Sequence, residues 1–303
     1  MKSILWVAAM TIRQEMIKAV SRSKAVMEDS ISSVINFLTE SINSDGGFRG
    51  RDKQSDLYYT VFGLEALLAL DSTFPRDKIF NFIRGLVKND PVDLVHLVSL
   101  IRCYANLSEN DIEKKFCSKF IKDLEGFRSK DGGFANGTGA EHGTAYGCFL
   151  ALAAYQDLQM DMPGSTEVAQ CIRALSIRNG GFTNNAKIKI ASTNATAAAM
   201  IALNHLNQPS DKRTADWLFA QCTLDGGFGA MSTAPVPDLL STATALHALA
   251  VIDFGIDTIK ERSLDFIDSL WCGKGGFYGN WADDIVDCEY TYYGLLALGH
   301  LGK

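Results

Sequence analysis

The sequence has 303 residues, of which 47% are hydrophobic and 21% charged, so it describes an ordinary globular chain with ample material for a core. The formal net charge of -6 argues against nucleic acid as a partner, because binding a phosphate backbone requires concentrated lysine and arginine. No stretch approaches the roughly 20 uninterrupted apolar residues of a membrane-spanning helix, so we expect no transmembrane segment.

The chain begins with a short apolar run that resembles a weak signal peptide. This run continues into an amphipathic stretch and lacks the small residues of a cleavage site. Residues 1–28 are therefore predicted to form an N-terminal helix that packs on the rest of the protein. The seven cysteines include no Cys-x-x-Cys pair and are odd in number, which favours a reducing compartment. We expect a cytoplasmic protein.

From residue 29 onward the dominant feature is a recurring Gly-Gly-Phe motif. It occurs at residues 46–48, 132–134, 180–182, 226–228 and 275–277. The phenylalanines are 86, 48, 46 and 49 residues apart. The first spacing is close to twice the others, which indicates a degenerate copy near residues 89–91. Periods of 20 to 50 residues are typical of arrays whose units bury their apolar faces against one another.

Each unit is predicted to contain an amphipathic helix, a Gly-Gly-Phe turn, a polar loop and a second helix. The first helices, with one apolar face, are expected at residues 29–43, 76–89, 110–128, 164–176, 209–222 and 256–272. The second helices are apolar or small nearly all round, as at residues 195–203 and 241–249, which is typical of a helix covered on both sides. We therefore place the first helices outside and the second helices inside.

The inner helices share a signature in which an alanine precedes a leucine. Aligning this signature places one residue of each inner helix in a common column, namely Ala66, Ser99, Ala151, Ala202, Ala248 and Ala297. Six pairs can close into a ring, whereas an open array needs polar capping repeats that the sequence lacks. The predicted fold is all-α, an (α/α)6 barrel or toroid of six outer and six inner helices over residues 29–303.

Polar residues precede the inner helices. Asp56, Glu141, Ser192, Asp238 and Asp287 occupy one column, and each is able to cap a helix N-terminus. Because the inner-helix N-termini converge at one mouth of the ring, these residues and their neighbours are expected to surround the mouth of a central cavity. The candidates are Tyr58, Tyr59, Glu141, His142, Asn194, Asp238, Ser241, Asp287, Glu289 and Tyr290. An apolar cavity with a polar rim is the usual form of a ligand site, but ordinary capping explains the same residues.

With its repeated motif and six helix pairs, the region from residue 29 to 301 resembles the β subunits of protein prenyltransferases and the related terpenoid cyclase domains. Residues 55–67 resemble the first inner helix of the Rab geranylgeranyl transferase β subunit. Residues 141–152 resemble the inner helix whose histidine contacts the prenyl diphosphate, and that histidine falls on His142. The resemblance implies an isoprenoid or another apolar small molecule as ligand, and a helical partner subunit or a homodimer.

The transferase resemblance also implies a catalytic zinc, held by an Asp-x-Cys pair on one inner helix and a histidine on the last. Asp238 matches the aspartate, but Leu240 or Ser241 stands where the cysteine belongs, and Tyr290 replaces the histidine. Leucine and neutral hydroxyl groups do not replace a thiolate or an imidazole. We therefore expect no zinc cofactor.

The cyclase resemblance implies an Asp-x-Asp-Asp-Thr motif whose carboxylic acid protonates an alkene. Residues 287–291 occupy that position, and Glu289 falls on the proton donor, with Asp287 two residues before it. Glutamate replaces one aspartate of the motif and Tyr290 another. Such a carboxyl group acts as an acid only where burial or a neighbouring charge favours its protonated form. The alternative is an ordinary solvated carboxylate at a helix end.

Three further residues complete the candidate site. His247 lies within the fifth inner helix, where it could line the cavity. Arg49 and Arg51 follow the first Gly-Gly-Phe turn and are candidates for contacts with an anionic headgroup, although exposed loop charges are usually only solvated. Two functions remain open. One is a zinc-independent enzyme that cyclises or transfers a prenyl chain held in the cavity. The other is a catalytically silent toroid that binds a lipid or a protein partner.

Overall fold

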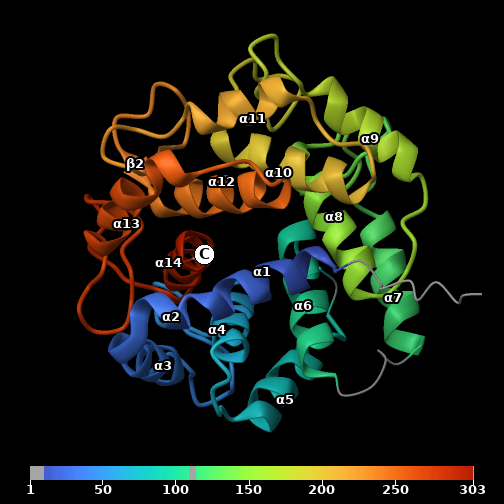
Figure 1. The fold of residues 1–303 in the computed structure, drawn as a ribbon. Helices are drawn as coiled ribbons and strands as arrows, with labels where there is room; N and C mark the ends of the chain where they lie inside the picture. The colour runs from blue at the N-terminus through green and yellow to red at the C-terminus, as the bar shows by residue number, and fades with distance from the viewer. Residues whose placement is uncertain (1–9, 90, 109–113, 303) are drawn as a thin grey trace, which may run out of the picture.

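The structure, a computed structural model, describes residues 10–89, 91–108 and 114–302 (Figure 1). Four parts of the sequence predictions lie outside these residues. They are residues 1–9 of the N-terminal helix, position 90 in the degenerate copy, residues 110–113 of the third outer helix, and residue 303 of the predicted barrel.

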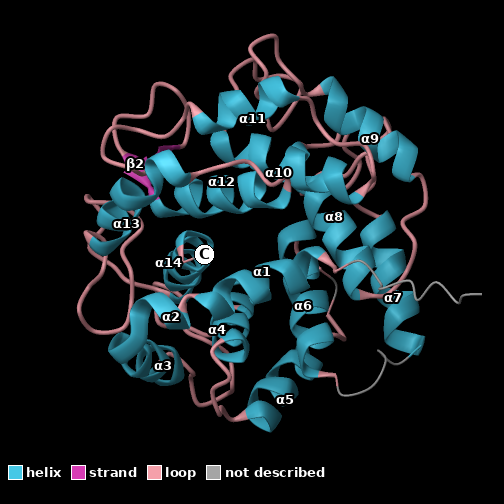
Figure 2. Cartoon of the chain, viewed as in Figure 1, coloured by secondary structure: helices cyan, strands magenta, loops and turns pink. Residues whose placement is uncertain are grey.

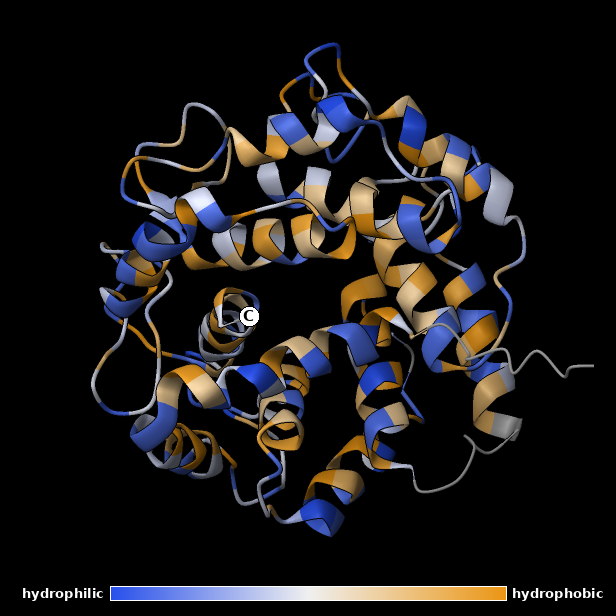
Figure 3. Ribbon diagram, viewed as in Figure 1, coloured by the Kyte–Doolittle hydropathy of each residue, from blue (hydrophilic) through white to orange (hydrophobic). Residues whose placement is uncertain are grey.

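Six roughly parallel helices form the inner wall of a ring. They are α4 (Leu57–Ala69), α6 (Leu94–Leu107), α8 (Ala145–Asp157), α10 (Thr193–His205), α12 (Leu239–Val251) and α14 (Cys288–Leu301). Each packs against its two neighbours, and α14 also packs against α4, so the ring is closed (Figure 1). Small and apolar residues predominate on these helices (Figure 3) because they are covered both by the outer helices and by each other. The predicted all-α toroid is confirmed.

The outer layer consists of shorter helices, each with one buried face. They are α3 (Ile31–Glu40), α5 (Arg76–Leu86), α7 (Lys114–Glu125), α9 (Ser165–Ala174), α11 (Lys212–Phe219) and α13 (Lys260–Asp268), and the short 3-10 helices η1 (Glu28–Ser30) and η2 (Asp257–Ile259) precede the first and last. They end earlier than predicted because the following residues turn back toward the phenylalanine of the motif. Ile42, for example, forms a β-bridge with Phe48.

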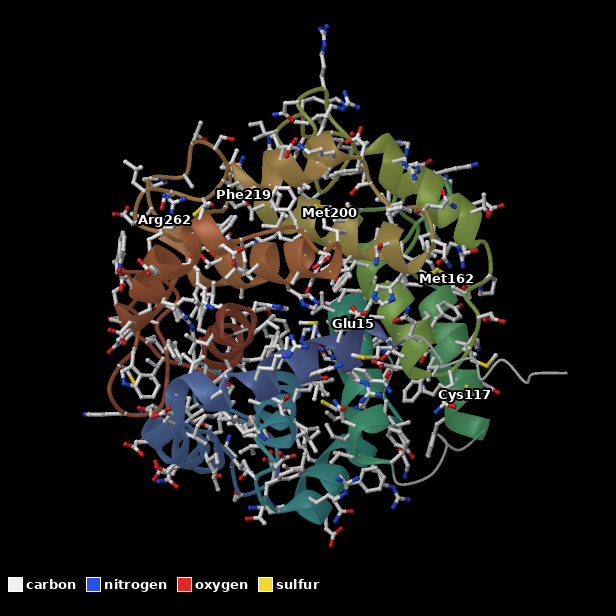
Figure 4. All side chains as sticks on the ribbon, viewed as in Figure 1. Glu15, Cys117, Met162, Met200, Phe219 and Arg262 are labelled. Carbon is white, nitrogen blue, oxygen red and sulfur yellow. The ribbon has the colours of Figure 1, made fainter. Side chains whose placement is uncertain are left out.

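Each Gly-Gly-Phe turn connects an outer helix to the inner helix that follows it and packs against the next outer helix. Gly226 has a φ of +90°, and a methyl group there would lie 2.1 Å from the carbonyl oxygen of Arg262, so only glycine fits (Arg262 is labelled in Figure 4). The adjacent Phe228 is fully buried, and its N–H donates to Thr242 Oγ1 at 2.9 Å. This turn leads into the two-residue strands β1 (Phe228–Gly229) and β2 (Pro237–Asp238), which pair antiparallel (β2 is labelled in Figure 2).

Backbone hydrogen bonds place the inner-helix N-termini at one end of the ring. The first N–H of an inner helix donates to the loop that follows the next Gly-Gly-Phe turn, as in Leu94 to Asn136, Ala145 to Asn184, Thr193 to Ala230 and Leu239 to Gly279. Between the last and first repeats a side chain makes the connection. Arg51 donates to Asp287 at 2.8 Å and to Asp283 at 2.7 Å.

The opposite end of the ring is covered by α1 (Ile12–Arg22), which continues into α2 (Lys24–Met27) and lies across the inner-helix C-termini (Figure 1). Arg13 forms a 2.6 Å ion pair with Asp157 at the end of α8. Glu15, labelled in Figure 4, pairs with His205 at the end of α10 at 3.1 Å. The barrel is therefore closed at one end by its own N-terminal segment.

The inner-helix alignment drawn from the sequence is wrong in two copies. Thr144, not Glu141, caps α8 by accepting the N–H of Gly147, so Ala154 and not Ala151 occupies the alanine column. The misalignment arose because the signature also fits residues 150–152, three positions too early. In the second copy Asp93 caps α6, so Cys103 and not Ser99 occupies the alanine column.

The contact between the last turn and the first outer helix provides a test of ring closure. Gly275 has a φ of +104°, and a methyl group there would lie 2.1 Å from the carbonyl oxygen of Ser33 in α3. Gly275→Ala should lower the free energy of unfolding by about 3 kcal/mol, measured by urea denaturation. Gly85→Ala in α5 adds the same methyl group into open space and should be neutral or stabilising by about 0.5–1 kcal/mol. Equal stability of the two variants would mean that closure does not depend on this contact.

Candidate functional site

A cavity of about 340 Å³ lies inside the ring, which is within the range of about 300–1,000 Å³ typical of ligand pockets. All six inner helices and α1 contribute to its lining. The apolar part of the wall includes Val61, Phe62, Val98, Phe149, Leu150, Ala198, Ile201 and Leu296. An elongated apolar ligand is therefore compatible with this interior.

The closed end of the cavity is polar. Met16 of α1 lies there beside Arg102, whose Nε and Nη2 donate to Glu65 at 2.5 and 2.7 Å. Asn106 donates a further hydrogen bond to Glu65 at 2.9 Å, so this carboxylate is paired although it is only 1% exposed. The sequence analysis missed Glu65 and Arg102. A single charged residue within each of two largely apolar inner helices was the available signal.

At the open end, the acid predicted from the sequence contacts a residue of the cavity wall. Glu289, in the first turn of α14, accepts a 2.6 Å hydrogen bond from the hydroxyl of Tyr58, which lines the cavity. Burial raises the pKa of Glu289 to about 7, and the charge of Asp287 acts in the same direction. The protonated form of this carboxyl group is therefore favoured relative to that of an ordinary glutamate, which supports a role in proton transfer.

Asp287 has different surroundings from Glu289. It caps α14 by accepting the N–H of Tyr290 at 2.9 Å, and its other oxygen accepts the hydrogen bond from Arg51. Burial raises the pKa of Asp287, and its two hydrogen bonds oppose that shift. The two carboxylates therefore have different roles. Asp287 caps α14 and binds Arg51, whereas Glu289 is hydrogen-bonded to Tyr58 of the cavity wall.

The other candidate residues lie at the mouth, in the wall or outside it. His247 lines the cavity, and its Nδ1 lies 3.0 Å from Nε2 of His300. Tyr59 packs edge-on against Tyr58, with ring centroids 5.7 Å apart. Tyr290 lies beneath the guanidinium of Arg51, 5.4 Å from its ring centroid. His247 therefore lies in the cavity wall, Tyr59 packs against Tyr58 of that wall, and Tyr290 lies beside the Arg51 ion pairs.

Asp238, His142 and Arg49, like Glu289 and Asp287, are not among the residues that line the cavity. Asp238 caps α12 and accepts hydrogen bonds from both the N–H and the hydroxyl of Ser241. His142 precedes α8 and has a side chain that is 58% exposed, 3.3 Å from Asp131. Arg49 forms a backbone bridge with Ser55 in the loop after the first turn.

The mouth also contains polar residues that the sequence analysis did not single out. Asn184 accepts the N–H of Tyr146 at 3.1 Å, and both residues line the cavity. Burial and then the charge of Glu289 raise the pKa of Tyr146 to about 12. Glu289 thus acts electrostatically on two tyrosines of the wall, Tyr58 and Tyr146.

Within residues 10–89, 91–108 and 114–302, no three His, Cys, Asp or Glu side chains are grouped so as to hold a metal ion. In the same part of the chain, no helix is long and apolar enough to cross a membrane.

Comparison with known proteins places this geometry in context. The family profile described as the prenyltransferase alpha-alpha toroid domain matches residues 14–179, 88–234 and 195–303. A search of curated proteins gives no match.

Among solved structures, a variant of the type II terpene cyclase MstE from Scytonema, in complex with the product merosterolic acid A, aligns with a TM-score of 0.62 and 14% identity over 93% of this chain and 97% of the cyclase. Another MstE variant, in complex with the substrate geranylgeranyl dihydroxybenzoate, aligns with a TM-score of 0.61 and 14% identity over 94% and 97%. Protein geranylgeranyltransferase-I from Candida albicans, complexed with GGPP, aligns with a TM-score of 0.62 and 17% identity over 78% and 83%. At these identities the similarity establishes a common fold.

The raised pKa of Glu289 predicts a pH-dependent stability. Glu289 titrates near pH 7 in the folded protein and near 4.5 when unperturbed, so the folded state binds the proton more tightly and stability falls as pH rises between these values. Glu289→Gln keeps an acceptor for the hydroxyl of Tyr58. It has no carboxyl group at this position to titrate, so its stability does not fall through this titration as pH rises. Relative to wild type, this variant should gain about 3 kcal/mol in unfolding free energy between pH 4 and pH 8, measured by urea denaturation. Glu40→Gln, at an exposed position, should show no such gain. A constant difference between Glu289→Gln and wild type would contradict the shifted pKa.

Proposed function

The chain belongs to the family of prenyltransferase alpha-alpha toroid domains, and on that basis we propose that it is an isoprenoid-acting enzyme that holds a prenyl chain in its central cavity. The observation that carries the proposal is the hydrogen bond between Glu289, whose pKa is raised to about 7, and Tyr58 of the cavity wall. This hydrogen bond places a group able to transfer a proton at the mouth of a largely apolar cavity.

The apolar wall supplies the affinity for the chain. Burying a twenty-carbon prenyl chain would gain roughly 16 kcal/mol at about 0.8 kcal/mol per carbon, against association costs of about 4–15 kcal/mol. The polar residues at the mouth are thus available for orientation and chemistry. Phe62, Phe149 and Leu296 are among the residues that would contact the chain.

The charges at the mouth favour a ligand with an uncharged head. Arg51 uses Nε for Asp287 and both terminal nitrogens for Asp283, so its charge is already paired with two carboxylates. Glu289 adds a further acid within this region. A diphosphate would be repelled by these carboxylates, and Arg51 is already paired and so is not available to bind it. A neutral prenyl alcohol or an uncharged prenylated aromatic compound would not be repelled.

We assign the role of general acid to Glu289, acting through Tyr58. Protonated Glu289 would donate to the oxygen of Tyr58 as the phenol donates its own proton into the cavity, so that one proton is delivered and Glu289 is left ionised. An acid with a pKa near 7 is weak and suits an oxygen atom of the substrate better than an alkene carbon. Protonation of the hydroxyl oxygen of a prenyl alcohol would let the C–O bond break with loss of water. The resulting allylic cation would then cyclise or bond to an acceptor, and a proton would be lost in either case.

The proposed reaction does not use zinc. Asp238, at a position that corresponds to a ligand of the zinc transferases, is engaged in capping α12, and Tyr290 packs beneath Arg51. With Leu240 and Ser241 in place of a thiolate, these donors do not fit the tetrahedral nitrogen and sulfur coordination that zinc prefers. No step of the proposed mechanism passes through a metal.

The ligands of the similar structures agree in kind with this proposal. The cyclase MstE takes a prenylated aromatic substrate, and the geranylgeranyltransferase takes GGPP. Both ligands carry a geranylgeranyl chain, which supports a chain of comparable length here. A dihydroxybenzoate carries less negative charge than a diphosphate, so the paired state of Arg51 disfavours the first type of headgroup less than the second.

Blocking the cavity should abolish ligand binding. Ala198, on α10, lines the cavity and is 6% exposed, so a phenyl ring there would fill space that the ligand needs. Saturating geranylgeraniol should raise the melting temperature of wild type by about 2–4 °C and leave that of Ala198→Phe unchanged. Ala174→Phe, at an exposed position on α9, should respond as wild type does. A thermal shift retained in Ala198→Phe would place the ligand elsewhere.

Removing the acid should affect turnover and not binding. With a neutral prenylated aromatic substrate identified by screening, Glu289→Gln should lower kcat by about 10²–10⁴-fold, because the amide keeps the shape but delivers no proton. Its geranylgeraniol shift should match wild type, and chelator treatment should leave wild-type activity unchanged. Glu40→Gln is the matched control.

Full activity of Glu289→Gln would eliminate the acid role. Ligand binding by wild type without turnover of any substrate tested would favour the second function, a catalytically silent toroid that binds a lipid or a protein partner.

A further inference from the structure

The third helix pair departs from a rule that the other Gly-Gly-Phe repeats obey. In those repeats a threonine four residues after the helix cap accepts the N–H of the motif phenylalanine, as in Thr60 with Phe48, Thr196 with Phe182, Thr242 with Phe228 and Thr291 with Phe277. In the third pair Cys148 occupies this position, and the N–H of Phe134 lies 3.4 Å from its sulfur.

The same pair breaks a second rule. In the other repeats an aromatic ring of the next outer helix covers the second glycine of the turn, as Phe82 covers Gly47, Trp217 covers Gly181, Phe266 covers Gly227 and Phe37 covers Gly276. The corresponding cover of Gly133 is Cys171 of α9. Both exceptions are cysteines, and both are in one repeat.

The two sulfur atoms meet at Gly133. A methyl group on this glycine would lie 2.4 Å from Cys171 Sγ and 3.1 Å from Cys148 Sγ, so both thiols face the same point. Gly143 lies over Cys171 from the other side, where a methyl group would be 2.8 Å from the sulfur. Both cysteines are buried as free thiols, yet the residues that cover the pair here are glycines without side chains.

The polar surroundings of the pair favour ionisation of one thiol. A hydrogen bond from Cys171 lowers the pKa of Cys148, and the N–H of Phe134 acts in the same direction. The reciprocal bond raises the pKa of Cys171, whose sulfur also lies 3.7 Å from Asp131. A thiolate beside a neutral thiol is the arrangement from which thiol oxidation and disulfide formation proceed.

Packing alone does not explain why cysteine stands in place of threonine at position 148 and in place of an aromatic residue at position 171. A thiol accepts hydrogen bonds more weakly than the hydroxyl of threonine. Cysteine also gives up most of the apolar contact area that the aromatic ring supplies in the other repeats. Each substitution weakens the repeat by itself, so a role that needs both sulfurs explains why the two occur together.

We propose that Cys148 and Cys171 form a redox modification site, a reversible disulfide that links inner helix α8 to outer helix α9. The oxidant is a hydroperoxide. One equivalent of hydrogen peroxide takes two electrons and two protons from the two thiols, one sulfur–sulfur bond forms, and two water molecules leave. A dithiol reductant reverses the reaction. The proposal stands independently of the function assigned to the cavity.

The bond would act on an element of the cavity. Helix α8 contributes Tyr146, Phe149 and Leu150 to the wall, and oxidation would fasten it to α9. Bonding of Cys148 to Cys171 would also change the acceptor available to the N–H of Phe134, which would couple the oxidation state to the Gly-Gly-Phe turn at residues 132–134.

The test is to oxidise the intact protein and locate the bond. Reduced wild type treated with hydrogen peroxide should lose two of its seven thiols, decrease in mass by about 2 Da and yield a peptide that joins Cys148 to Cys171. Dithiothreitol should restore both thiols. Because the bond closes the loop from residue 148 to residue 171 and so lowers the conformational entropy of the unfolded chain, the melting temperature of the oxidised form should rise by about 5 °C.

Cys148→Thr is the matched variant, since it installs the residue that four other repeats use at this position. It should fold, form no linked peptide and show no oxidation-dependent rise in melting temperature. Cys103→Ala, which removes a buried thiol elsewhere, should retain both effects. Oxidation of Cys148 or Cys171 to sulfinic acid without a linked peptide would overturn the proposal. So would a stoichiometric metal ion held by the two thiols in purified protein.

Discussion

The hydrogen bond from each motif phenylalanine to the second turn of an inner helix is the constraint on which the rest of the structure depends. It fixes the turn to the helix that follows, as in Phe228 with Thr242, and the left-handed glycine before it sets the turn against the next outer helix. Since each motif phenylalanine bonds to the same helix position, which is threonine in four repeats and Cys148 in the third pair, the inner helices run in one direction. Their N-termini then gather at one end, and that end becomes the mouth of the cavity.

A ring of repeats has one place where the last unit meets the first, and the candidate site lies there. Between successive repeats, backbone groups make the connection, whereas Arg51 with Asp287 and Tyr58 with Glu289 join α14 to the first repeat. Side chains make this junction distinct from the four at which a backbone hydrogen bond joins the start of α6, α8, α10 or α12 to the next loop. A repeated fold thereby acquires one chemically different position on an otherwise regular mouth.

The sequence was sufficient for those features that repeat. The five motifs and the apolar second helices predicted the number of pairs, the closed ring and the position of Glu289 beside the mouth. The alignment failed where a second copy of the signature, at residues 150–152, competed with the correct one. That error hid the correspondence of Cys148 with the threonines, so the exception became visible only in the structure. The contact of Tyr58 with Glu289 joins residues 231 positions apart, and no local pattern encodes it.

The neighbouring charges explain why two acids two residues apart differ in state. Burial raises the pKa of both, but Asp287 is tied to Arg51 and to the N-terminus of α14, which together favour its ionised form. Its negative charge then raises the pKa of Glu289, whereas the charge of Arg51 lowers it. Removing Arg51 would leave that repulsion uncompensated and hold Glu289 more firmly protonated. The ion pair at the junction of the last and first repeats therefore also influences the proton affinity of the acid, so Arg51 takes part both in the closure of the fold and in the chemistry of its mouth.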